Sequence, residues 1–204
     1  MMIEHPVAWI CVGAGGELAL YLFLNGRTLV RERTLDDVFP FLRSLERNEM
    51  AELFDVMEEA YKRLRTTEYR FCREQRVRLD LAREYFRRML HNALIIHQWA
   101  NTELRDNINK EPGYYNQREQ QVITVCERAS EFRMLTQVVL TKIWFLSLLH
   151  QLDKLHLAPA LRVAALRKTG TADVLNLYER LKDAAAALAL TYGVDYYNEI
   201  NSRM

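Results

Sequence analysis

The apolar residues from Thr34 to the end of the chain are spaced as in amphipathic helices: they recur every three or four positions, with polar residues between them. Only seven glycines and four prolines interrupt the 204 residues, too few for a sheet protein built on tight turns. The pattern therefore predicts a mainly α-helical protein. Caps and breaks place a first helix at Thr34, where Asp36 and Asp37 follow, and five more at about 48–65, 68–108, 115–155, 159–170 and 171–192.

The two longest predicted helices, 68–108 and 115–155, are joined at Pro112-Gly113, the clearest break in the sequence. At 1.5 Å per residue, a helix of about forty residues reaches ~60 Å, which is longer than a compact chain of this size requires. We therefore expect an elongated helical bundle built on a long antiparallel helix pair. Residues 134–149 are apolar on nearly all sides, which predicts that this part of the second long helix is buried at the centre of the bundle.

An apolar segment precedes the helical region, because residues 7–24 contain a single charge, Glu17. As a helix this segment would span about 27 Å, close to the ~30 Å hydrocarbon core of a bilayer. The sequence thus favours two parts: residues 1–33, an apolar segment with one membrane helix as an anchor, and residues 34–204, a helical bundle domain. Two alternatives are a β-hairpin that turns at Asn25-Gly26, and a strand followed by a glycine turn and a short helix.

Flanking charges and cysteines predict where the protein resides. Glu4 precedes the apolar segment and three arginines follow it within ten residues, so the positive-inside rule places the bundle on the cytoplasmic or matrix side of a membrane. The three cysteines, Cys11, Cys72 and Cys126, are odd in number and far apart, which predicts free thiols in a reducing compartment. Because Glu4 stands where a signal peptide carries a basic residue, no cleavable signal peptide is expected.

The net charge of the whole chain is +1, but residues 62–88 contain ten basic and four acidic residues. Thr66-Thr67 is either a break or part of a longer helix. Placing residues every 100° separates an apolar arc, which includes Leu64 and Phe71, from a basic arc. The basic arc, our candidate interaction site, consists of Lys62, Arg65, Arg73, Arg76, Arg83 and Arg87.

Three interpretations of the basic arc compete. It is a solvated face with pairs four residues apart, such as Glu84 and Arg88, or it contacts anionic lipid headgroups or an acidic partner protein. The third interpretation is phosphate contact with nucleic acid, for which arginine is well suited. No helix-turn-helix, RNA-binding or zinc motif accompanies the arc, so nucleic acid is the least favoured partner.

The sequence offers no catalytic, cofactor-binding or metal-ligating residue that we can assign. The histidine pairs 91/97 and 150/156 are six residues apart and point in different directions on a helix; adding Asp153 to the second pair gives a weak metal half-site. The glycines at 13–16 follow part of the dinucleotide-binding fingerprint, but Leu18 stands where its third glycine is required. No nucleophile motif or phosphate-binding loop occurs.

Long helices, an apolar anchor and the lack of a recognisable catalytic motif predict a protein that acts by binding other proteins rather than by catalysis. We expect a non-enzymatic accessory or scaffold subunit of a larger, membrane-bound assembly, with protein subunits as partners and anionic lipid as a further one. One alternative is a soluble helical adaptor or regulator that uses the basic arc on nucleic acid or an acidic partner. The other is a helical enzyme with a bound metal or cofactor.

Overall fold

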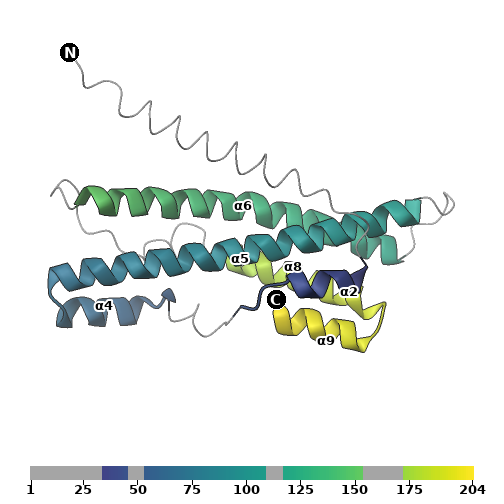
Figure 1. Ribbon diagram of the computed structural model, residues 1–204, viewed down its shortest axis with the longest axis horizontal. Helices are drawn as coiled ribbons and strands as arrows, with labels where there is room; N and C mark the ends of the chain where they lie inside the picture. Colours follow the sequence, from purple (N-terminus) through teal and green to yellow (C-terminus); the bar gives the residue numbers. More distant parts are fainter. Residues whose placement is uncertain (1–33, 46–52, 109–116, 154–171) are drawn as a thin grey trace, which may run out of the picture. The chain divides into compact units, whose positions relative to one another are not determined.

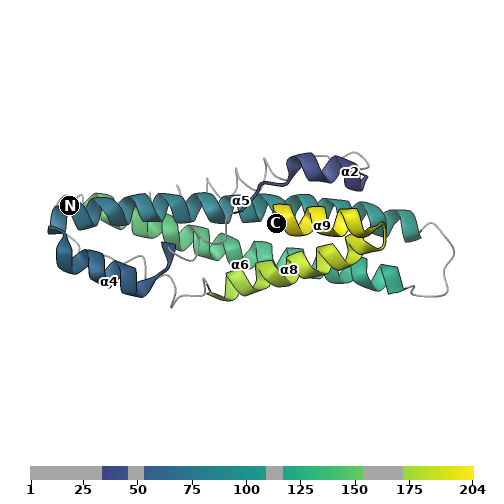
Figure 2. The ribbon, with the colours of Figure 1, turned by 90° about the horizontal axis from the view of Figure 1, so that it is seen from below.

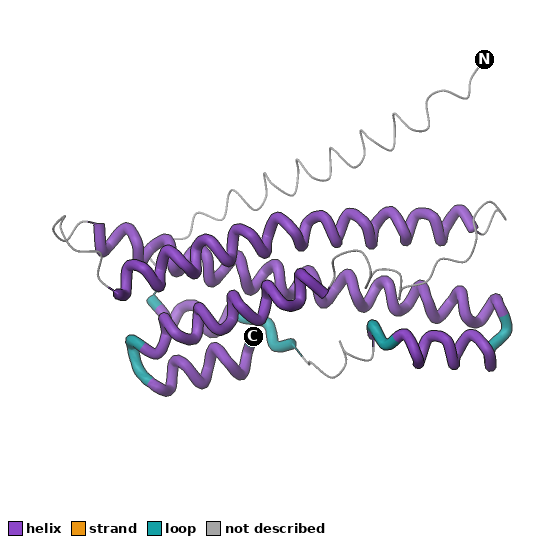
Figure 3. The backbone as a smooth tube through the Cα atoms, turned by 180° about the vertical axis from the view of Figure 1, so that it is seen from behind, coloured by secondary structure: helices purple, strands orange, loops and turns teal. Residues whose placement is uncertain are grey.

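The computed structural model describes residues 34–45, 53–108, 117–153 and 172–204, and every regular element in these ranges is a helix (Figure 3). The prediction of a mainly helical protein is confirmed for these residues. The elements are α2 (Leu35–Val38), η1 (Phe39–Phe41), α4 (Val56–Arg65), α5 (Glu68–Ile108), α6 (Gln117–Asp153), α8 (Ala172–Leu190) and α9 (Val194–Arg203).

No described helix is both long and apolar enough to cross a bilayer. The predicted membrane helix at 7–24 and its two alternatives lie outside the described residues, as do the break at Pro112-Gly113 and the predicted helix 159–170.

The antiparallel helix pair is α5 and α6, which lie side by side along most of their length (Figure 1). Buried positions in both helices recur alternately every three and four residues, so they form one seam, as in a coiled coil. In α5 they include Phe71, Gln75, Arg78, Ala82, Tyr85, Met89, Asn92, Ile96 and Trp99. In α6 they are Val122, Val125, Ala129, Phe132, Thr136, Val139 and Ile143. The prediction of a long antiparallel pair is confirmed.

Helix α8 packs against α6 and returns through a tight turn to α9 (Figure 2). The turn ends at Gly193, whose φ of +146° is a conformation that residues with a side chain rarely adopt. Our prediction that the last helix ends near Tyr192 is correct for α8. It missed α9, which follows Gly193 directly and buries Ile200 in the same core.

The segment from Thr34 to Leu45 is tied to the helices by polar contacts. The predicted helix start at Thr34 is confirmed, because its N–H and hydroxyl both donate to the Asp37 carboxylate, at 3.2 and 2.9 Å. Further along, the side chain of Asn92 donates to the Arg43 carbonyl at 2.9 Å and accepts from the Arg43 N–H at 2.8 Å. Its amide also donates to the Tyr178 hydroxyl of α8 at 3.0 Å. One buried amide thus joins three parts of the chain.

Two expectations about helix positions are wrong. The predicted helix 48–65 is not continuous, because the chain leaves helical conformation at Phe54 and Asp55, and Asp55 caps α4 by accepting from the backbone N–H groups of Met57 and Glu58. The prediction of burial for residues 134–149 is wrong at the side chains that the structure describes, 134–148: Thr136, Val139 and Ile143 are buried, whereas several large apolar side chains of α6 face outward.

Candidate interaction site

The turn between α4 and α5 decides where the predicted basic arc lies. Thr66 ends α4 in an extended conformation, and its hydroxyl and N–H both donate to the Lys62 carbonyl, at 2.6 and 3.0 Å. The chain then reverses, so that α4 lies beside α5 (Figure 1). The alternative of one helix through Thr66-Thr67 is therefore wrong, and a single arc drawn across it does not exist. Leu64, which that arc placed in the core, is 87% exposed.

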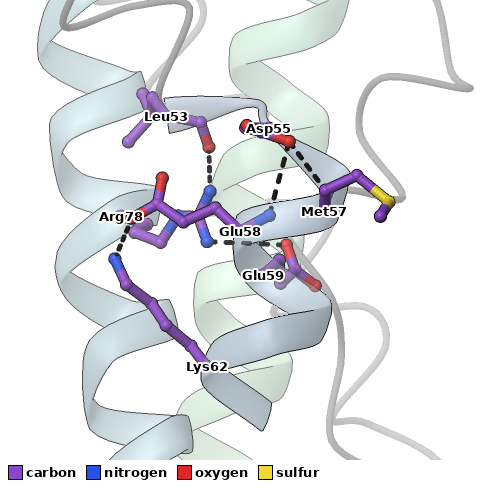
Figure 4. Close-up of polar contacts among 7 residues, drawn as sticks. All are labelled: Leu53, Asp55, Met57, Glu58, Glu59, Lys62 and Arg78. Carbon is purple, nitrogen blue, oxygen red and sulfur yellow. Dashed lines mark hydrogen bonds and ion pairs between the residues drawn. The ribbon is translucent and has the colours of Figure 1, made fainter. Parts of the chain in front are cut away.

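The face of α4 that contacts α5 is polar. Glu59 of α4 and Arg78 of α5 are only 3% and 8% exposed, and Arg78 Nη1 lies 3.9 Å from Glu59 Oε2 (Figure 4). The other terminal nitrogen of Arg78 donates to the Leu53 carbonyl at 2.6 Å. Next to this ion pair, the ring of Phe54 packs against that of Phe86, with centroids 6.1 Å apart. The attachment of α4 thus combines a buried ion pair, the aromatic contact of Phe54 just before the helix, and the Arg63 guanidinium, which lies 5.9 Å from the centroid of the Phe71 ring.

The opposite face of α4 is apolar and points outward. Met57, Tyr61 and Leu64 occupy successive turns and are 78, 53 and 87% exposed. An amphipathic helix on a globular protein ordinarily buries this face. The guanidinium of Arg65 lies 4.4 Å from the centroid of the Tyr61 ring, which holds a cation at the edge of the apolar face.

The six residues of the predicted basic arc are divided between two helices. Lys62 and Arg65 lie on α4, where Lys62 pairs with Glu58 at 2.5 Å (Figure 4). Arg83 of α5 turns toward α6: it lies 3.7 Å from Asp80 and donates to the Ser147 hydroxyl at 3.1 Å. The remaining three arginines form no hydrogen bond or ion pair with any residue that the structure describes. They are Arg73, Arg76 and Arg87.

A second exposed apolar surface lies on the C-terminal half of α6. Four large apolar side chains point outward from it, and three of them, at positions 134, 138 and 145, fall within about 40° of one another around the helix. Met134 is 71% exposed, Leu135 40%, Val138 49% and Phe145 50%. The apolar character that we interpreted as burial therefore marks an outward surface.

A cluster of reactive residue types lies between α5 and α6. A His97 ring nitrogen lies 3.2 Å from the Asn101 amide nitrogen, and the other ring nitrogen lies 3.4 Å from the Ser130 hydroxyl. The Cys126 thiol contacts the Asn101 amide oxygen at 3.6 Å. Sequence spacing could not reveal this cluster, because its members come from two helices that only the fold brings together.

The protonation states of this cluster disfavour nucleophilic chemistry. Burial, and next the neighbouring Glu127, raise the pKa of the Cys126 thiol, so it stays protonated at neutral pH. Burial, and next the charge of Arg133, lower the pKa of His97, so its imidazole is neutral there. A protonated thiol that contacts an amide rather than an imidazole is not an activated nucleophile.

A polar cluster centred on Arg118 fixes the turn after α8. Arg118 of α6 donates to the Glu103 carboxylate at 2.9 Å and to the Tyr192 hydroxyl, and its guanidinium lies 4.5 Å from the centroid of the Tyr192 ring. Burial first, and Glu103 second, raise the pKa of Tyr192. These contacts are structural.

In the part of the chain that the structure describes, no group of histidine, cysteine and acidic side chains could hold a metal ion, and the side chains at 150, 153 and 156 lie outside that part.

Comparison of this chain with protein-family models, with curated proteins and with solved structures finds no match.

Proposed function

We propose that this protein is a non-enzymatic scaffold subunit of a larger membrane-bound assembly, and that it docks a partner protein on the outward face of α6. The observation that carries the proposal is the set of exposed apolar side chains on α6, from Met134 to Phe145. Neighbouring exposed apolar side chains on a rigid element mark interaction sites, whereas isolated ones are common on any surface.

The energetics of such a surface suit a protein partner. Burial of apolar area contributes about 25 cal/mol per Å², and a few large side chains near the centre of an interface provide most of the binding energy. Helix α6 is held by α5 on one side and α8 on the other, so binding need not order it. The face is therefore formed before the partner arrives.

The two alternatives receive less support. An adaptor that uses the basic arc needs its cations on one surface, but Lys62 and Arg65 lie on α4 and Arg83 faces α6. For a helical enzyme, the cluster between α5 and α6 offers no activated thiol, because burial raises the pKa of Cys126 and its thiol contacts an amide.

The docking proposal is tested by charge substitutions on α6 with a matched pair elsewhere. Val138→Glu with Phe145→Glu should shift the tagged chain in a detergent extract from a large complex to the size of the chain alone. Leu190→Glu with Val194→Glu changes two similarly exposed apolar residues at the α8–α9 turn and should leave the complex intact. Unchanged circular dichroism and melting temperature would show that both variants fold. Equal sedimentation of the two variants would refute the proposal.

The membrane setting is tested separately, by carbonate extraction of membranes that contain the full chain or a chain lacking residues 1–26. If residues 7–24 span the bilayer, the full chain resists extraction and the shortened chain is released, because carbonate removes only peripheral proteins. Release of both chains would contradict a membrane anchor and leave the α6 result unaffected.

A further inference from the structure

We propose that α4 is a membrane-surface helix, whose apolar face enters the headgroup region of an anionic bilayer while the neighbouring cations contact lipid phosphates. The inference rests on the proposed membrane setting of the protein, but it does not depend on a protein partner for α6.

The orientation of α4 on the bundle is the first argument. Its polar side is turned inward by the buried pair of Glu59 and Arg78, and Arg78 is fixed further by the Leu53 carbonyl (Figure 4). This attachment turns Met57, Tyr61 and Leu64 outward together. The same helix, rotated by half a turn, would bury its three apolar residues and expose Glu59. The structure thus displays the face that a helix in water ordinarily hides.

The charges around this face are the second argument. At 100° per residue, Arg65 lies 40° from Tyr61 at the edge of the apolar face, whereas Arg63 is turned toward α5, where its guanidinium lies 5.9 Å from the centroid of the Phe71 ring. Three more arginines follow on the first turns of α5, Arg70, Arg73 and Arg76. Tyr69, at the start of α5, is a further strongly exposed aromatic residue beside these cations. An apolar face with an arginine at its edge, further arginines nearby in the chain and tyrosines beside it is the composition of helices that lie in the membrane interface.

This combination separates a bilayer from other anionic partners. Nucleic acid or an acidic peptide would use the cations but would leave the leucine and methionine between them in water. A bilayer surface takes up both, because the acyl-chain boundary accepts the apolar side chains and the headgroups accept the cations. With ten residues, α4 is about 15 Å long, which fits a helix that lies along the surface and is too short for one that spans the membrane.

The first test is flotation of the purified full chain with vesicles of phosphatidylcholine alone or mixed with phosphatidylserine. Leu64→Glu should lower the partition coefficient on the mixed vesicles about tenfold, whereas Val194→Glu, an exposed apolar residue of α9, should not change it. Arg65→Gln should lower it about fivefold, and Arg180→Gln, an exposed arginine of α8, should leave it unchanged. Equal binding by Leu64→Glu and the parent chain, together with no lipid adduct at position 64 in the measurement below, would overturn the proposal.

A second measurement remains valid if another part of the chain also binds the vesicles. A photo-crosslinking amino acid at position 64 should form lipid adducts on the mixed vesicles, and the same amino acid at position 194 should not. Adducts at neither position, or equally at both, would overturn the proposal. Binding to single-stranded DNA that Arg65→Gln weakens, together with no lipid adduct at position 64, would instead assign the cations to nucleic acid. None of these outcomes bears on the complex that α6 variants disrupt.

Discussion

The two ends of α5 are covered in different ways. Its C-terminal half is enclosed by α6, α8 and the segment 34–45, and Ile96 and Trp99 there are fully buried. Its N-terminal end carries α4, which is attached through the ion pair of Glu59 and Arg78 and through Phe54. The C-terminal half of α5 therefore lies in an apolar core. At its N-terminal end, α4 contacts α5 through a polar face and exposes its apolar face.

This difference predicts a difference in stability along one helix. Apolar packing stabilises the fold in proportion to the apolar area removed from water, and it requires no specific bonding partner. A buried ion pair must first repay the desolvation of two charges, so its net contribution is small even where its removal is costly. We therefore expect α4 to open locally at a lower free energy than the core around Trp99, as weakly packed units of proteins do.

The largest effect is expected from a substitution in the apolar core around the C-terminal half of α5. Trp99→Ala should lower the free energy of unfolding by about 3–5 kcal/mol, because a fully buried indole leaves a cavity. Phe54→Ala, at the α4 end, should instead speed amide hydrogen exchange in α4 and change the global urea midpoint much less. The comparison fails if Phe54→Ala lowers the global midpoint as much as Trp99→Ala does.

The next effect concerns the ion pair. Arg78→Met removes a cation that pairs with the buried Glu59 carboxylate, so we expect α4 to open more easily by about 3 kcal/mol. Adding Glu59→Leu should restore much of this loss, because the second change removes the buried carboxylate that Arg78 had paired. Hydrogen exchange of the α4 amides measures both. If the two substitutions add, the ion pair does not hold α4.

A polar contact at the core end gives the third prediction. Asn92→Ala removes the hydrogen bonds to both backbone groups of Arg43 and to the Tyr178 hydroxyl, and should cost about 2 kcal/mol in unfolding free energy. Because these bonds tie down the segment 34–45, tryptic cleavage after Arg43 should also accelerate. Asn101→Ala, which changes a half-buried asparagine of the same helix, should leave that cleavage rate unchanged.

The sequence predicted the long helices well, because their apolar residues recur in register over about forty positions and no tertiary contact has to override them. It failed at Leu64, because periodicity gives the faces of a helix but not which face its neighbour covers. The same limit explains α6: an apolar stretch looks alike whether it is buried or displayed. α9 escaped prediction because it is short and begins directly after a glycine that signals an end.

The candidate site was predictable only in its composition. The arginines of residues 62–88 stand out in any count, but their common surface depended on Thr66-Thr67. A single pair of residues there reverses the chain and separates Lys62 and Arg65 from the others. The contact of Cys126 with Asn101 depends on the pairing of α5 with α6, which no local pattern encodes.

The smallest effect should come from pH. The pKa of His97 is lowered in the folded protein, first by burial and second by Arg133, so the unfolded chain takes up a proton near pH 6.5 before the folded protein does. Its contribution to stability is therefore complete above pH 6.5 and is lost as the pH falls through the lower folded pKa. His97→Gln removes this difference, so the parent chain should lose more stability than the variant between pH 8 and pH 5. Other groups titrate in both proteins alike, and urea denaturation at the two pH values isolates the His97 contribution. A parallel loss in both proteins would mean that the imidazole is already solvated at the seam between α5 and α6.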